Sequence, residues 1–208
     1  MKRLFGLFFL KIFGWKRAGE KPAIDKYVML CVPHTSNWDF PLFLAAIWSF
    51  RESLNWLGKH TLFEGPLGWF YPLVGGVAVD RSAPGGLVAQ ITGQFATRDF
   101  LHVAIPPSGT RSFRDHWKSG FYRIALAADV PVVCAFLDFK TKTTGFGPTI
   151  YLTGDQKVDM DKIRAFYDGM QGKFVDKTST VRLRSEDPDT EATGDATPAA
   201  TVSEPEGR

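Results

Sequence analysis

From residue 27 onward the sequence alternates short runs rich in β-branched and aromatic residues with runs of helical periodicity. The strand-like runs are 27–33, 54–58, 75–81, 101–107, 131–139 and a shorter one at 149–154, and the helical runs are 39–50, 86–98, 120–128 and 162–171. Parallel strands need long crossover connections, which helices usually supply. The alternation therefore predicts an α/β fold with a mixed, mostly parallel sheet flanked by helices.

Length and charge favour one globular domain that meets an anionic partner. The chain has 208 residues, 44% of them hydrophobic, which is enough for one packed core. Its net charge is +3, but residues 175–208 hold four basic and eight acidic side chains, so residues 1–174 carry +7. Candidate partners for this basic body are a phosphate-bearing substrate, an anionic membrane surface and nucleic acid.

The first seventeen residues combine five basic side chains with many large apolar ones. The apolar run from Leu4 to Leu10 is far shorter than the roughly 20 residues of a membrane-spanning helix. On a helical wheel one broad face holds Phe5, Phe8, Phe9, Ile12, Phe13 and Trp15. Arg3 and Lys11 lie opposite, as in helices that rest in the membrane interface. Residues 1–19 are therefore predicted to form an amphipathic, membrane-contacting helix; packing on the protein's own core is the alternative.

The composition changes after about residue 175 to Thr, Glu, Asp, Pro, Ala and Ser. Val181, Leu183 and Val202 are the only large aliphatic residues beyond that point. Such a segment has too little apolar surface to offset the entropy lost on ordering. Residues 175–208 are therefore predicted to form a disordered acidic tail, which leaves residues 20–174 as the single α/β domain.

The two cysteines, Cys31 and Cys134, each lie inside an apolar strand-like run. Buried, reduced thiols are expected there rather than a disulfide framework, which favours a cytosolic environment. The histidines, cysteines and acids show no metal-ligand spacing beyond the weak pair His60 and Glu64, so no metal site is predicted.

A histidine and an aspartate stand where the first strand-like run passes into a helix. Pro33 ends the run, and the next six residues read HTSNWD, from His34 to Asp39. The Ser and Asn residues favour a helix start, which places His34 in the loop and Asp39 in the first turn, where the two can face each other. A carboxylate beside a histidine fixes its tautomer and stabilises the imidazolium, so His34 is a candidate general base. A hydrogen-bonded structural histidine is the alternative.

Other positions offer groups for an anionic substrate. Arg81 ends the strand-like run 75–81, at the edge where open α/β sheets bind ligands, and its guanidinium suits a phosphate. An ordinary strand with a surface ion pair is the alternative there. Lys59 precedes another apolar stretch and is a further candidate for the same pocket.

The segment PPSGTRS that follows the run 101–107 is a turn with anion-binding potential. Gly109 permits close approach of the backbone, and Thr110 and Arg111 can hold an anion. Lys118 lies at the start of the next helical run, whose free N–H groups can add to such a site.

Taken in order, these segments resemble the glycerolipid acyltransferase family, which includes the lysophosphatidate acyltransferases. The first block of that family is a His and an Asp separated by four residues (HX4D), here His34 and Asp39. The second is a Gly-led strand that ends in Arg, here GGVAVDR. The third is typically Pro-Glu-Gly-Thr-Arg-Ser, here PSGTRS, and the fourth is an apolar Val-Pro strand, here VPVV. The resemblance covers roughly residues 20–172.

The resemblance implies an acyltransferase domain over residues 20–174 and a mechanism. His34, oriented by Asp39, would remove the proton of an acceptor hydroxyl, which attacks the thioester of acyl-CoA or acyl carrier protein. Neither a bound cofactor, nor a metal, nor a covalent acyl-enzyme is implied. Arg81, Gly109 and Arg111 would bind the phosphate or glycerol portion of the acceptor.

The expected enzyme is therefore a 1-acylglycerol-3-phosphate O-acyltransferase of phospholipid biosynthesis. Its implied partners are membrane lipids, the acyl carrier and a lyso-lipid acceptor. With the basic N-terminal helix, the resemblance predicts a peripheral protein on the cytoplasmic face of the cell membrane.

One residue departs from the family pattern: Ser108 stands where the third block has Glu. If that Glu orients the acceptor, the change predicts another acceptor or a loss of activity. A non-catalytic peripheral membrane protein that binds lipid is therefore the alternative function. A hydrolase with a Ser108 nucleophile lacks the Gly-x-Ser-x-Gly turn, and nucleic-acid binding lacks a recognition motif.

Overall fold

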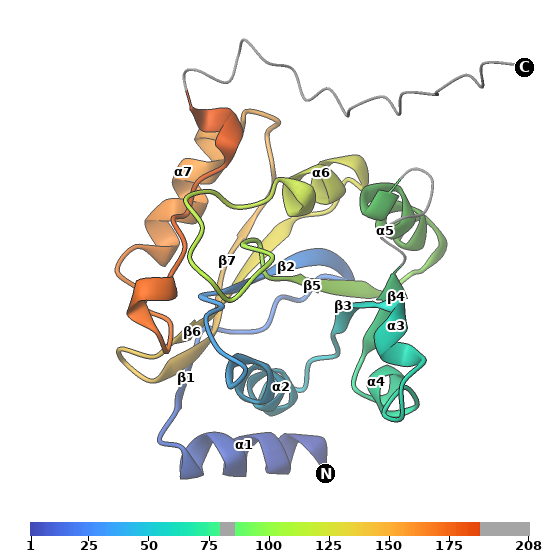
Figure 1. Cartoon of the computed structure of the whole chain (residues 1–208), viewed down its shortest axis with the longest axis vertical. Helices are drawn as coiled ribbons and strands as arrows, with labels where there is room; N and C mark the ends of the chain where they lie inside the picture. Colours follow the sequence, from blue (N-terminus) through green and yellow to red (C-terminus); the bar gives the residue numbers. More distant parts are fainter. Residues whose placement is uncertain (80–85, 188–208) are drawn as a thin grey trace, which may run out of the picture.

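The computed structural model describes residues 1–79 and 86–187 and places seven strands of these ranges in one sheet (Figure 1). The strands are β1 (Lys16–Ala18), β2 (Lys26–Val32), β3 (Asn55–Lys59), β4 (Gly76–Val79), β5 (Leu101–Ile105), β6 (Val132–Asp138) and β7 (Thr143–Ile150). Their order across the sheet is β1-β7-β6-β2-β5-β3-β4. Only the β6–β7 pair of these is antiparallel, so the predicted mixed, mostly parallel sheet is confirmed.

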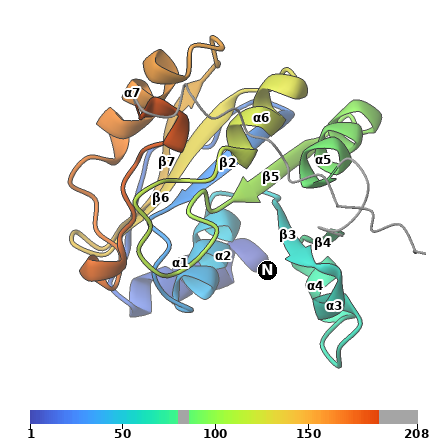
Figure 2. The ribbon, with the colours of Figure 1, turned by 45° about the horizontal axis from the view of Figure 1, so that its top comes forward.

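Helices cover both faces of the sheet (Figures 1 and 2). They are α1 (Lys2–Ile12), α2 (Asp39–Ser49), α3 (His60–Phe63), α4 (Phe70–Leu73), α5 (Gly86–Thr97), α6 (Gly120–Ala127) and α7 (Gln156–Tyr167), with short 3-10 turns η1 (Val175–Lys177) and η2 (Arg184–Glu186). The buried core residues accordingly form separate clusters on the two faces of the sheet. Val28 and Leu30 of β2 pack with residues of α5, α6 and α7, whereas Tyr27 and Met29 pack with α2. A central parallel strand is buried on both faces in this way, which explains its uninterrupted apolar sequence.

Two elements begin earlier than the sequence predicts. β7 starts at Thr143 rather than at residue 149, although its first half contains Gly and Pro. Gly145 is needed because a Cβ there would lie 1.8 Å from the carbonyl oxygen of Ala18 in the neighbouring β1. Likewise α7 begins at Gln156 rather than 162, because the Asp155 side chain accepts hydrogen bonds from two N–H groups of its first turn.

The N-terminal segment is only partly the helix that the sequence predicts. α1 ends at Ile12, and residues 16–18 form β1 parallel to β7. Gly6 and Leu10 are buried against α2, where a Cβ on Gly6 would meet the carbonyl oxygen of Ala45 at 2.4 Å. Trp15 is buried too, so the prediction that it lies on the lipid-facing side of the helix is wrong. This narrow side of α1 packs on the protein's own core, as the alternative interpretation of the N-terminal segment predicts.

The opposite side of α1 stays apolar and exposed. Leu4, Phe5, Phe8 and Ile12 are each more than half exposed. Within the described residues, no helix combines the length and apolar character needed to cross a bilayer. α1 thus has one side packed on the protein and one on which Leu4, Phe8 and Ile12 stay largely exposed.

The prediction of disorder from residue 175 is wrong for residues 175–187. With residues 171–174 they form a C-terminal strap (171–187) in which Leu183 is fully buried and makes a β-bridge to Trp117. The backbone partners of Trp117 and the space for Leu183 come from distant parts of the chain, so composition did not reveal them. Residues 188–208 lie outside the described residues.

Both cysteines are free thiols, as predicted. Cys134 is fully buried, and that burial raises the pKa of its thiol to about 12. Cys31 is only partly buried, because its side chain borders the cavity described below.

Candidate active site

Three parallel strands bring the candidate residues to one edge of the sheet. His34 follows β2 by two residues, Arg111 lies in the loop after β5, and Lys59 is the last residue of β3. Because β2 pairs with β5 and β5 with β3, all in parallel, their carboxyl ends meet at the same edge. The topology therefore gathers residues that are as much as 77 positions apart, from His34 to Arg111.

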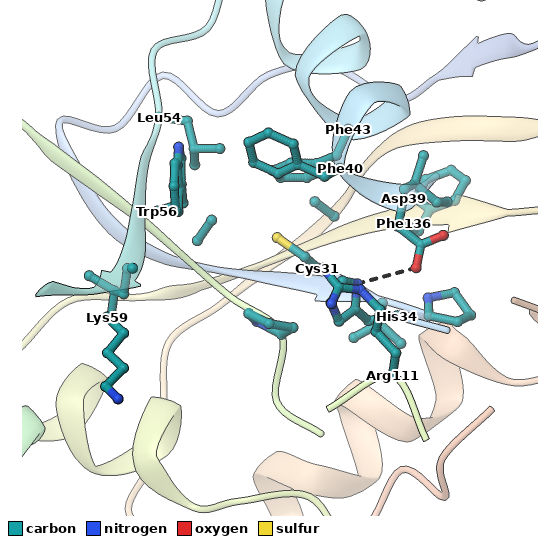
Figure 3. Close-up of a pocket in the computed structure, with 18 of the residues that line it drawn as sticks. Cys31, His34, Asp39, Phe40, Phe43, Leu54, Trp56, Lys59, Arg111 and Phe136 are labelled. Atoms are coloured by element: carbon teal, nitrogen blue, oxygen red, sulfur yellow. Dashed lines mark ion pairs between the residues drawn. The ribbon is translucent and has the colours of Figure 1, made fainter. Parts of the chain in front are cut away.

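His34 and Asp39 form a close pair at this edge (Figure 3). The Nδ1 atom of His34 lies 3.2 Å from Oδ2 of Asp39, and the Asp39 side chain is almost fully buried. Asp39 Oδ2 also accepts hydrogen bonds from the N–H groups of Thr35 at 2.7 Å and Ser36 at 2.8 Å. The two backbone hydrogen bonds, together with the nearby imidazole, hold the carboxylate in place.

This arrangement determines what His34 can do. Because the Asp39 carboxylate lies beside Nδ1, it favours the tautomer with the proton on that nitrogen, which leaves Nε2 with a free lone pair. A neutral imidazole with a buried carboxylate behind it can take a proton from a bound hydroxyl, and the carboxylate stabilises the cation that forms.

His34 and Asp39 lie in the wall of a cavity of about 400 Å³. The rest of the wall is mainly apolar and comes from the strand faces, α2 and the segment after β3. Its apolar members include Cys31, Phe40, Phe43, Leu54, Trp56, Leu57, Leu62, Ala104, Ala135, Phe136 and Leu137. Burial raises the pKa of the Cys31 thiol well above its ordinary value, so this group stays protonated and serves as apolar surface.

Two of the predicted cationic residues reach the same cavity. Arg111 lies near His34, and its Nε donates a hydrogen bond of 3.3 Å to the carbonyl oxygen of Ser36. That bond leaves the terminal nitrogens of its guanidinium for a ligand. Lys59 also borders the cavity and lies across it from Asp39 in Figure 3. The apolar chamber thus has a positive charge at each of two places.

Gly109 and Lys118 lie against each other, and neither of them lines the cavity that contains His34. A Cβ on Gly109, whose φ is +66°, would meet the Lys118 side chain at 3.1 Å. The Lys118 N–H donates to the carbonyl oxygen of Pro107, which folds the loop 106–118 back on itself. Thr110 is engaged within the loop, because its hydroxyl accepts from the Ser112 N–H. Arg81 lies outside the described residues.

The C-terminal strap contacts both loops of the candidate site. The Phe174 N–H donates to the Thr35 hydroxyl at 3.3 Å, and the Arg114 N–H donates to the Ser179 hydroxyl at 3.1 Å. The N–H of Trp117 donates to the carbonyl oxygen of Arg182. Residues of the strap therefore tie the loop after β2 to the loop after β5.

The other histidines are engaged elsewhere. His102 pairs with the buried Glu52 at 2.8 Å, a contact away from the cavity. His116 pairs with Asp187 of the strap at 2.8 Å. Among the described residues, no group of three or more His, Cys, Asp or Glu side chains is arranged to hold a metal ion.

Comparison with known proteins identifies the family. The family model described as Acyltransferase matches residues 18–137, which is more than half of the chain. The chain belongs to the acyltransferase family. This confirms the resemblance to glycerolipid acyltransferases, and the matched range contains the His34–Asp39 pair, Arg111 and Lys59.

The acyltransferase also has a solved structural relative. The 1-acyl-sn-glycerophosphate (LPA) acyltransferase PlsC from Thermotoga maritima aligns with a TM-score of 0.55 and 17% sequence identity, over 78% of this chain and 73% of that chain. At this identity the similarity shows a shared fold. No curated protein matches the sequence closely.

Sequence reasoning missed two parts of the candidate site. One is the apolar wall, because Phe43, Leu54 and Trp56 read as ordinary core residues. The signal was present in β2, where alternate residues Tyr27, Met29 and Cys31 share the α2 face. The other is the strap, which lies beyond residue 137 and hence outside the family match.

Proposed function

We propose that this acyltransferase moves a fatty acyl group from a thioester carrier to the hydroxyl of a lyso-glycerophospholipid such as 1-acylglycerol-3-phosphate. The observation that carries the proposal is the position of the His34–Asp39 pair in the wall of an apolar cavity that also holds Arg111. The apolar wall suits a fatty chain, and the guanidinium suits a phosphate. These are the two chemical parts of such an acceptor.

In the proposed reaction, Nε2 of His34 takes the proton of the acceptor hydroxyl as its oxygen attacks the thioester carbonyl carbon. The tetrahedral intermediate then expels the carrier thiolate, so the C–S bond breaks and the ester C–O bond remains. The imidazolium returns its proton to the thiolate. The Asp39 carboxylate stabilises the imidazolium between these two steps. The products are the diacyl lipid and the free thiol of the carrier.

The proposal extends to location and partners. The exposed apolar side of α1 carries Phe8 and Ile12, with Lys2, Arg3 and Lys11 on the same helix. Such a helix binds an anionic bilayer surface by apolar burial and charge attraction. We therefore place the protein peripherally on the cytoplasmic face of the cell membrane, with acyl-CoA or acyl carrier protein as donor, no bound cofactor and no nucleic-acid partner.

The test is release of free thiol from acyl-CoA and from acyl carrier protein by the purified full chain, with a panel of acceptors. Lysophosphatidate presents a phosphate, lysophosphatidylcholine presents a zwitterionic headgroup, and monoacylglycerol has no phosphate. We expect turnover with lysophosphatidate, and a rise in the KM for that acceptor of about tenfold or more in Arg111→Gln, since one charge-assisted contact is lost. Lipid binding without turnover for any acceptor or donor would instead support a non-catalytic lipid-binding protein.

A further inference from the structure

A second surface exposes large apolar side chains at a distance in sequence from α1. We call residues 60–74, which comprise α3, α4 and the turn between them, the apolar arm. Its exposed side chains are Leu62, Leu67, Trp69, Phe70 and Leu73, and those of Trp69 and Leu73 are 70% and 62% exposed. Neither α3 nor α4 contains a buried residue. The arm therefore presents its apolar side chains outward.

The arm is nevertheless a well-packed unit. On its inner side Phe63 and Tyr71 contact Trp56 of β3, with ring centroids 6.1 and 5.6 Å away, and the Trp56 indole N–H donates to the carbonyl oxygen of Val74. The turn needs Gly68, because a Cβ there would lie 2.0 Å from the carbonyl oxygen of Phe63. Aromatic packing thus fixes the inner side while the outer side stays apolar.

The arm borders the catalytic cavity. Leu62 of α3 is 45% exposed and also lines the cavity. Lys59, which directly precedes α3, lines the cavity as well. Trp56 belongs both to the cavity wall and to the aromatic packing under the arm. The exposed surface of the arm is therefore continuous with the chamber that contains His34.

Charge indicates what covers this surface. Segments 1–13 and 59–74 contain Lys2, Arg3, Lys11 and Lys59 against a single acid, Glu64. Figures 1 and 2 show α1 and the arm on the same side of the sheet as α2. Tryptophan and phenylalanine beside lysine form the residue set that rests in the headgroup region of a bilayer.

We propose that the apolar arm inserts Trp69, Phe70 and Leu73 into an anionic membrane, as a second contact besides α1. The proposal rests on the proposed function, since a lipid acceptor has to pass from the bilayer into the cavity. Two contacts fix the orientation of the protein on the bilayer. In that orientation the side of the cavity lined by Leu62 and Lys59 lies at the membrane. A lyso-lipid then enters the cavity past the arm without crossing water.

The test measures binding of the full chain to vesicles of phosphatidylcholine with and without phosphatidylglycerol. The variant Trp69→Ser/Leu73→Ser is compared with Val158→Ser, an exposed apolar residue of α7 on the opposite face of the sheet. We expect the arm variant to lose about tenfold or more in vesicle affinity, because two large apolar side chains leave the bilayer. Val158→Ser should stay within about twofold of the unaltered chain, as an exposed residue away from the surface.

A second measurement separates membrane contact from altered folding. Acyl transfer to a short-chain, water-soluble acceptor should persist in Trp69→Ser/Leu73→Ser, while transfer to a vesicle-borne acceptor falls. Binding is also measured for His34→Ala, which should bind vesicles as the unaltered chain does. Absence of turnover therefore bears on the proposed function alone, and vesicle binding bears on the arm alone.

Two results would overturn the proposal. One is unchanged vesicle affinity in a folded Trp69→Ser/Leu73→Ser protein. The other is a dimer of the unaltered chain in vesicle-free buffer, seen by analytical ultracentrifugation, that this variant dissolves. The arm would then be a contact between two copies.

Discussion

The hydroxyl of Ser108 donates a hydrogen bond of 2.8 Å to the carbonyl oxygen of Thr110 and closes the turn that carries Gly109. Ser108 is buried and faces a void of about 10 Å³ that is also lined by His34 and by Thr178 of the strap. This space is smaller than a carboxyethyl group. The short side chain of Ser108 therefore fits the space that this chain leaves for it, where other acyltransferases have a longer acid.

We predict that Ser108→Glu destabilises the protein and does not restore a family-like acceptor site. Its carboxylate has to displace the strap or lose its water without a partner, at a cost of about 1–3 kcal/mol. Thermal unfolding checks this, with Ser108→Ala as the control, which should lose about 1 kcal/mol for the missing hydrogen bond. A Ser108→Glu protein of unchanged stability and higher turnover would contradict it.

Asp39→Asn should lower kcat with little effect on the acceptor KM. The amide can still accept from the Thr35 and Ser36 N–H groups, but it cannot stabilise an imidazolium. We expect a loss of about 10²–10⁴-fold in kcat, the range of general-base assistance. The matched control is Asp129→Asn in the exposed turn after α6, which should leave kcat unchanged. Equal effects of the two changes would exclude a role for Asp39 in the proton transfer.

The buried pair Glu52 and His102 predicts how stability depends on pH. Burial alone would raise the pKa of Glu52, but hydrogen bonds from His102 and the Ser53 N–H, with the charges of His102 and Lys21, outweigh it and leave the pKa below its ordinary value. The lowered pKa means that the carboxylate stabilises the fold above the unfolded-state pKa near 4.5. That contribution is lost as the pH falls through the folded-state pKa.

Urea unfolding between pH 3 and 7 tests this pair. Glu52→Gln should lower the free energy of unfolding at pH 7 by about 1–2 kcal/mol, because the neutral amide can still accept these hydrogen bonds but no longer strengthens them with its charge. It should also flatten the decline in stability below pH 4.5. A variant that keeps the full acid dependence would show that other carboxylates cause it, and Asp138, whose pKa is also lowered, would be the next to change.

Leu183→Ala should weaken both the fold and acceptor binding. Leu183 is fully buried beside Trp117, so truncation should cost about 2–5 kcal/mol in the free energy of unfolding. Because the strap holds the loop 106–118, the acceptor KM should rise as well. Val175→Ala, an exposed change in the same strap, is the control and should alter neither quantity. An unchanged KM in Leu183→Ala would separate the strap from acceptor binding.

The predictable parts of this molecule were those with local signals. The alternating runs gave the α/β class, and the spacing of His34 and Asp39 anticipated their contact, because a loop position and a first-turn position can meet. The first half of β7 was not predicted, because the fit of Gly145 against Ala18 depends on a strand about 130 residues away. The strap was not predicted because the burial of Leu183 depends on its contact with Trp117, and composition does not reveal contacts between distant residues.

The most direct test of the central claim is the rate of thioester cleavage by His34→Ala in the presence of lysophosphatidate. Removal of the base should lower kcat by about 10²–10⁴-fold, while vesicle binding and the melting temperature stay near those of the unaltered chain. Acceptor-dependent turnover that survives in His34→Ala would contradict the assignment of His34 as the general base.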